Sequence, residues 1–122
     1  VSEAATLRHQ PEERLAGAFE ARRLAPWRAD PLFEIAVAAL ESGNRANIAE
    51  ASEVLERMRW LRPYSASLAD LRGHLAQALG EIPAAAAEAW TARVFNPSNP
   101  VYQQRASELF LQLRDDDAVK GR

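Results

Sequence analysis

The sequence predicts an all-α fold built from antiparallel helix–turn–helix repeats. Alanine is abundant and β-branched residues are scarce, which favours helix over strand. Three segments that end alike close with proline at nearly equal intervals, "FEARRLAP" at Pro26, "LERMRWLRP" at Pro63 and "WTARVFNP" at Pro97. Because proline cannot continue a helix, each of these residues marks a helix end and together they mark a repeat.

Glycine and capping residues place the helix ends between the prolines. Gly43 and Gly80 follow Pro26 and Pro63 at the same distance, where a left-handed glycine would end a helix. Either Ser65 or Ser67 can cap the helix that follows Pro63. The other start signals are Asp30-Pro31, Asn99-Pro100, Pro83 and a capping box made by Asn47 and Glu50. We therefore expect helices at about 11–24, 31–42, 48–61, 66–79, 83–94 and 100–114, after a frayed segment at about 2–8.

The length of 122 residues corresponds to one domain. We expect a single helical-repeat domain over 1–114, with a half repeat at 11–26, full repeats at 27–63 and 64–97, and a capping helix at 98–114. The polar tail at 115–122 is expected to fray. Because the chain begins with Val1 rather than methionine, we also expect it to be a piece of a longer protein.

The interval from Pro63 to Pro97 resembles the period of the tetratricopeptide repeat (TPR), which is about 34 residues. In this last full repeat, Gly73 and Ala85 stand where the two helices of a TPR cross, and Ala89 stands where the family usually has a larger residue. Arg72 departs from the pattern, because an apolar residue is usual there. The resemblance covers about residues 11–114 and implies a right-handed TPR-like α-solenoid of about 2.5–3 repeats plus the capping helix.

A weaker resemblance concerns a parent protein. The segments "APWRADPLF" and "RPYSASL" are similar to repeats appended to bacterial membrane glycan polymerases and O-antigen ligases. This resemblance implies an accessory tail at either the cytoplasmic or the periplasmic face of a bacterial membrane. The longest apolar run, at 31–40, is too short to span a bilayer, so we expect no direct membrane insertion by this segment.

Enzymatic chemistry is not expected. The chain has no cysteine, which excludes thiol catalysis and cysteine-bound zinc. It contains no nucleophile elbow, phosphate-binding loop or metal-binding motif, so we assign no catalytic residue, metal site or cofactor. The net charge of −2 gives no electrostatic reason to expect nucleic acid as a partner.

The first helices of stacked repeats line a concave surface, and TPR geometry implies which side chains face it. Family members that bind a terminal carboxylate use lysine, arginine and asparagine at these positions, and this chain has none of these residue types at the positions that face the concave surface. The candidate partner-binding positions are Phe33, Val37 and Leu40, then Asp70, His74 and Gln77, then Gln104 and Glu108.

The helix "PLFEIAVAAL" has almost no polar face beyond Glu34. A helix that is apolar all round is normally buried all round. The stripe formed by Phe33, Val37 and Leu40 is therefore covered by a missing first helix, by a second copy of the chain or by a bound peptide, and these three alternatives stay open. We expect a non-catalytic protein–protein interaction module, with an accessory tail of a glycan-assembly enzyme as the alternative.

Overall fold

The computed structural model describes residues 3–24 and 30–120, and it describes side chains over 13–24 and 31–115. Helices account for most of the described residues and no strand occurs among them, which confirms the all-α prediction. The helices are α1 (Glu3–Leu24), α2 (Asp30–Ser42), α3 (Arg45–Arg57), the short 3-10 helix η1 (Arg59–Leu61), α4 (Ala66–Ala78), α5 (Ile82–Phe95) and α6 (Pro100–Lys120).

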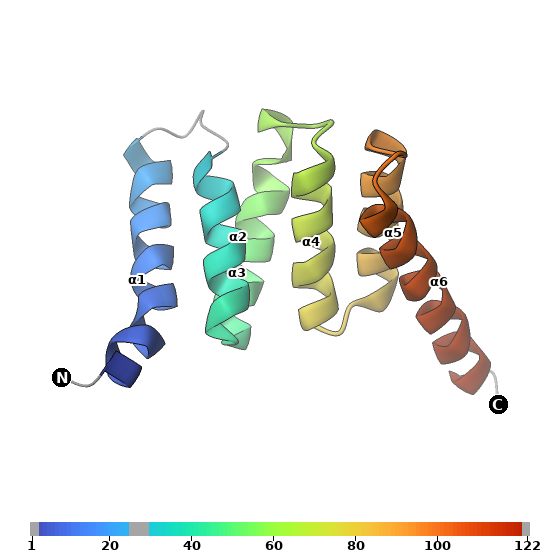
Figure 1. Ribbon diagram of the computed structural model, residues 1–122, viewed down its shortest axis with the longest axis horizontal. Coiled ribbons are helices and arrows are strands. Elements are labelled where there is room, and N and C mark those ends of the chain that lie inside the picture. The colour runs from blue at the N-terminus through green and yellow to red at the C-terminus, as the bar shows by residue number, and fades with distance from the viewer. Residues whose placement is uncertain (1–2, 25–29, 121–122) are drawn as a thin grey trace. The chain divides into compact units, whose positions relative to one another are not determined.

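The chain forms two compact units. The first spans Val1–Pro63 and contains α1, α2, α3 and η1, whereas the second spans Tyr64–Arg122 and contains α4, α5 and α6. Within each unit, successive α-helices run antiparallel (Figure 1). The boundary coincides with the predicted boundary between the repeats at 27–63 and 64–97. Each unit is described by itself below.

Both turn glycines adopt the conformation that the sequence predicts. Gly43 has φ +64° and Gly80 has φ +81°, in the left-handed region that other residues rarely enter. The N–H of Gly80 donates to the carbonyl of Gln77 at 3.0 Å. These glycines therefore end α2 and α4 and allow the chain to reverse direction.

The start signals of unit 2 are also confirmed. The Ser65 hydroxyl accepts a hydrogen bond from the N–H of Leu68 at 3.2 Å, so Ser65 rather than Ser67 caps α4. The Asn99 side chain accepts from the N–H of Val101 at 2.9 Å, and α6 begins at Pro100. Pro83 lies in the first turn of α5, where its missing N–H costs nothing.

The predicted start of α3 is wrong by three residues. The Asn44 side chain, rather than that of Asn47, accepts from the N–H groups of Ala46 at 2.9 Å and Asn47 at 3.2 Å. Asn44 directly follows the left-handed Gly43 and has the extended backbone of an N-cap, with φ −89° and ψ 118°. The helix therefore begins as soon as the turn is complete.

Asn44→Ala is expected to destabilise unit 1 by about 1 kcal/mol, because two N–H groups at the start of α3 lose their acceptor. The midpoint of urea unfolding, followed by circular dichroism, measures this change. Asn47→Ala serves as the control and is expected to change stability by less than about 0.5 kcal/mol. A larger loss in the control would identify Asn47 as the cap.

Two predicted ends of the chain also differ from the structure. Residues 2–8 and 11–24 were expected to be separate, but α1 continues through Pro11, and its ribbon bends towards its amino-terminal end (Figure 1), as expected for a helix that contains proline. The tail was expected to fray after residue 114, but α6 continues to Lys120. No glycine or proline occurs between Pro100 and Lys120 to end that helix.

The core of unit 2 consists largely of alanine, so its helices approach closely. A methyl group built on Gly73 would lie 3.4 Å from the carbonyl oxygen of Ala85 and 3.4 Å from Cβ of Glu88. This confirms the predicted crossing of Gly73 with the helix that carries Ala85. The buried core cluster comprises Ala76, Ala85, Ala86, Ala89, Ala106 and Leu109.

Arg72, the residue that departs from the repeat pattern, is buried in unit 2 with its side chain 6% exposed. Its Nε donates to the carboxylate of Glu88 at 3.2 Å, and the Glu88 side chain is itself only 16% exposed. A buried cation is tolerated when an anion neutralises it and accepts its hydrogen bond. The ion pair therefore links α4 to α5 next to the Gly73 crossing.

Candidate functional site

Three of the predicted partner-binding residues lie together on α4. Asp70, His74 and Gln77 are all half-buried and follow one another at helical spacing. The Asp70 carboxylate and the His74 Nε2 atom are 3.5 Å apart, which makes an ion pair only when the imidazole is protonated. Their i,i+4 spacing brings the two side chains together on one face of α4.

Arg105 of α6 joins these residues across the unit. Its guanidinium donates to Oε1 of Gln77 at 2.7 Å, and its Nε lies 3.5 Å from Oδ1 of Asp70. The latter two atoms are buried and neither makes a hydrogen bond, so this contact is an ion pair with poor alignment. Arg105 therefore connects the polar face of α4 to α6.

Burial lowers the pKa of Arg105, whereas the charges of Asp70 and Glu108 act to raise it. Arginine nonetheless stays charged in proteins. Its positive charge lies between two carboxylates, one on α4 and one on α6.

Two further predicted residues extend this polar face along α6. Gln104 and Glu108 are exposed, and the Gln104 amide donates to the Glu108 carboxylate at 2.9 Å. Arg105 is adjacent to Gln104 and three residues from Glu108, and that position was the signal that could have identified it from sequence. We call the whole set the polar surface; it comprises Asp70, His74, Gln77, Gln104, Arg105 and Glu108.

The other three predicted residues lie in unit 1. Phe33, Val37 and Leu40 are each half-buried on α2, whereas Leu32 and Ile35 on the same helix are at most 1% exposed. The side chains of the stripe are thus partly exposed to solvent and partly covered by the rest of the chain. Side chains of residues 1–12 lie outside the described part of the chain.

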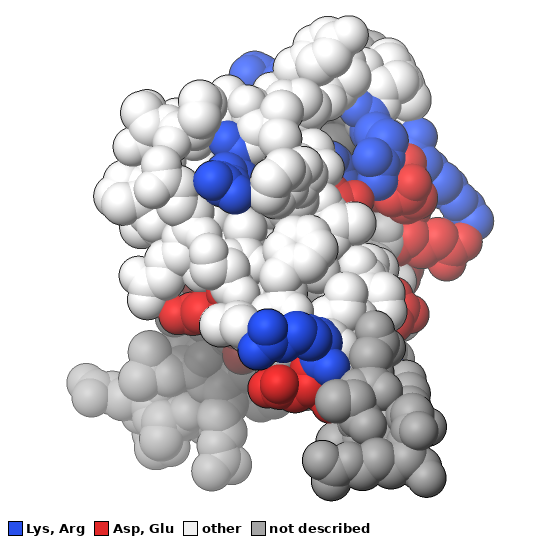
Figure 2. All heavy atoms as spheres, turned by 90° about the vertical axis from the view of Figure 1, so that its right-hand side faces the viewer, with Lys and Arg blue, Asp and Glu red and all other residues white. Residues whose placement is uncertain are grey.

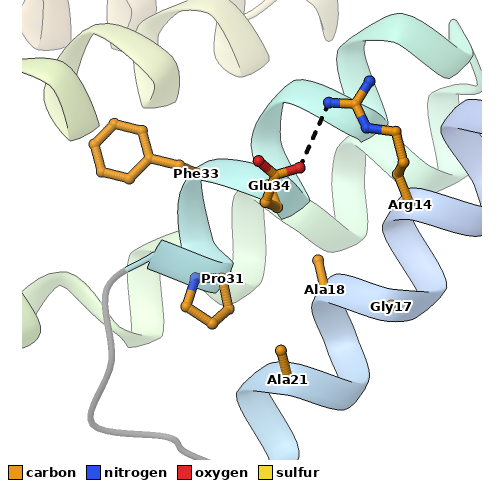
Figure 3. A pocket seen from close by; sticks show the side chains of 7 residues that line it. All are labelled: Arg14, Gly17, Ala18, Ala21, Pro31, Phe33 and Glu34. Carbon is orange, nitrogen blue, oxygen red and sulfur yellow. Dashed lines mark hydrogen bonds and ion pairs between the residues drawn. The ribbon is translucent and has the colours of Figure 1, made fainter.

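Phe33 lines a hollow of about 490 Å³ between α1 and α2. The α1 side of this hollow has no bulky apolar group, because Gly17, Ala18 and Ala21 form it. Figure 3 shows the Phe33 ring extending away from α1, while Arg14 of α1 reaches towards Glu34 of α2. We call this site the α1–α2 hollow; it is lined by Arg14, Gly17, Ala18, Ala21, Pro31, Phe33 and Glu34.

Charges at the rim of the α1–α2 hollow are paired. The Arg14 guanidinium lies 2.6 Å from the carboxylate of Glu41 and 3.5 Å from that of Glu34. These groups are well exposed, so the pairs contribute little stability. Gly17 has open space around it, because a methyl group built there would meet no atom within 4 Å.

An exposed aromatic cluster lies on α5 and α6, and the sequence did not predict it. The rings of Trp90 and Phe110 meet edge to face with centroids 5.9 Å apart, and the Arg93 guanidinium lies 4.9 Å from the Trp90 ring. Trp90 remains 47% exposed. The Trp90 ring therefore lies at the surface, whereas its neighbour Ala89 is buried in the core of unit 2.

Among the described residues, no group of three or more histidine, cysteine, aspartate or glutamate side chains is placed to hold a metal ion. No helix in the described ranges combines the length and apolarity needed to cross a bilayer.

No model of a known protein family matches the chain, and no curated protein matches it either.

Proposed function

We propose that the chain is a non-catalytic, TPR-like interaction module that holds a segment of another protein against the polar surface. The observation that carries the proposal is that Arg105 bridges α6 to Asp70 and Gln77 of α4. Through this bridge, residues that are distant in sequence share one face.

The proposed TPR-like architecture draws support from the spacing of equivalent features. The capping residues Ser65 and Asn99 are separated by the same interval as Ala66 and Pro100, the first residues of α4 and α6. The interval from Pro63 to Pro97 is the same again. The close contact between Gly73 and Ala85 is the small-residue crossing that this architecture requires. A right-handed superhelical stack of the repeats is part of the proposal.

The chemistry of the polar surface favours a polar, extended peptide. Carboxamides both donate and accept hydrogen bonds, so Gln77 and Gln104 can pair with peptide groups of a bound segment. The carboxylates of Asp70 and Glu108 outnumber the single guanidinium of Arg105. An acidic tail would therefore meet net repulsion, whereas a neutral or basic segment would not.

Selection from a displayed library of random peptides tests this proposal. Selected peptides are expected to be neutral or basic and to bind with modest affinity, since part of the interaction energy is spent in ordering them. Gln104→Ala combined with Glu108→Ala is expected to weaken binding about tenfold or more, because both side chains are exposed members of the polar surface.

The matched control is Ser107→Ala, which truncates an exposed residue of the same helix outside the polar surface. It is expected to leave peptide affinity unchanged. Equal losses in the control and the double variant would contradict the proposal, as would a library that gives only acidic binders.

A further inference from the structure

The α1 side of the α1–α2 hollow corresponds, through the repeat, to the face of α5 that binds α4. The helices α1 and α5 end at Leu24 and Phe95. The interval between these two residues equals the interval between the closing prolines Pro26 and Pro97. Leu24 is therefore the counterpart of Phe95, and each other residue of α1 has its counterpart on α5 at the same separation along the chain.

This separation places Gly17 and Ala18 of α1 at the positions of Glu88 and Ala89 of α5. Those two residues of α5 are the neighbours of Gly73, with Cβ of Glu88 at 3.4 Å and the N–H nitrogen of Ala89 at 3.7 Å from a methyl group built there. In unit 2 the corresponding space is occupied by α4. The hollow therefore has the position and the small-residue lining of a docking site for a helix that resembles α4.

The chain contains a second α4-like helix, namely α6. Alignment of their first residues, Ala66 and Pro100, makes Ser107 of α6 the counterpart of Gly73 of α4. Ala106 and Leu109 face α5 in the core, whereas Ser107 is exposed and Phe110 is 44% exposed. The face that α4 uses to bind a following helix is thus open on α6.

We propose that α6 of one molecule docks in the α1–α2 hollow of a second copy, antiparallel to α1, as α4 docks on α5. The equivalences place Ser107 over Gly17 and Ala18, so that small residues meet at the crossing. Phe110 is the counterpart of Ala76, and Arg14 is the counterpart of Ala85. Because Ala76 and Ala85 belong to one core cluster in unit 2, the equivalences place Phe110 beside Arg14. A guanidinium next to an aromatic ring is a favourable contact.

The surface that carries α6 suits such a contact. Figure 2 views the molecule from the side on which α6 lies in Figure 1, and it shows wide areas of uncharged side chains with separate groups of basic and acidic side chains between them. Docking uses faces outside the polar surface and so goes beyond the proposed function.

The two docking faces differ from each other, so the association is heterologous and continues from copy to copy unless the rotation closes a ring. Sedimentation velocity of the wild-type chain at concentrations up to about 1 mM is expected to show a mass rising beyond the 13.5 kDa of one chain. A single species of 13.5 kDa over the whole range overturns the proposal.

Two blocked variants test the pairing itself. Gly17→Arg places a charged side chain in the hollow, where the fold has room for it, and Ser107→Arg does the same on α6. Each variant alone is expected to stay monomeric. An equimolar mixture is expected to form a heterodimer, because the intact α6 of the Gly17→Arg variant can dock in the intact hollow of the Ser107→Arg variant. Association is expected to stop there, because both other faces of the heterodimer are blocked.

Ala16→Arg and Gln112→Arg are the matched controls, since they add the same side chain at other exposed positions of α1 and α6. Both are expected to associate like the wild type. Circular dichroism verifies folding, and Ala21→Arg replaces Gly17→Arg if the latter is unfolded. A mixture of blocked variants that stays monomeric, or blocked variants that each dimerise alone, overturns the proposal.

Discussion

Glu88→Ala is expected to destabilise the protein by about 3 kcal/mol, because it leaves the guanidinium of Arg72 buried without its carboxylate partner. The Arg72 side chain is only 6% exposed and cannot turn to water without disturbing the helix crossing. Urea unfolding followed by circular dichroism measures the loss, and unit 2 is expected to unfold first.

The double variant Arg72→Leu with Glu88→Leu is the control for this prediction. Replacement of a buried ion pair by apolar residues of similar volume is often neutral or stabilising. The double variant is therefore expected to be within about 1 kcal/mol of the wild type. If Glu88→Ala changes stability by less than about 0.5 kcal/mol, the ion pair is not buried as described.

Gly73→Leu is expected to cost about 1–3 kcal/mol by overpacking the crossing of α4 and α5. The first added carbon would already touch the backbone oxygen of Ala85 at 3.4 Å, and a backbone atom cannot move aside as a side chain can. The melting temperature, measured by circular dichroism, is expected to fall.

Gly17→Leu provides a matched control because it makes the same change in another helix. A methyl group built on Gly17 meets no atom within 4 Å, and leucine favours helix over glycine by about 0.5–1 kcal/mol. The control is expected to be neutral or stabilising. Equal destabilisation of both variants would show that Gly73 is not at a close crossing.

Most helix ends could be predicted because their signals are local. Gly43 and Gly80 end helices through backbone conformations that other residues avoid, and Ser65 caps α4 within three residues. The error at Asn47 arose because two asparagines lie three residues apart. The conformation of Gly43 then decides in favour of Asn44, its immediate neighbour.

The candidate site was predictable only in part, because contacts between helices are not local. Asp70 and His74 share a helix, so their spacing predicts their contact. The contact of Arg105 with Gln77 spans 28 residues, and that of Arg72 with Glu88 spans 16. Such pairs depend on which faces of two helices meet, and the hydrophobic pattern alone does not specify this at the level of single residues.

The exposed aromatic pair shows the same limit. Trp90 and Phe110 lie on different helices, and their contact follows from how α5 and α6 pack through Ala86, Ala89 and Ala106. Because the core residues are small, the helices approach closely and the large rings stay outside. Trp90 is accordingly 47% exposed and Phe110 is 44% exposed.

The most direct test of the proposed function is to map a selected peptide onto the ¹⁵N-labelled chain by NMR. The predicted result is a set of amide shift changes concentrated at residues 70–77 of α4 and residues 104–108 of α6, with little change around the α1–α2 hollow. Shift changes concentrated in unit 1, or a library that gives no sequence-specific binder, would contradict the assignment of the polar surface as the partner-binding site.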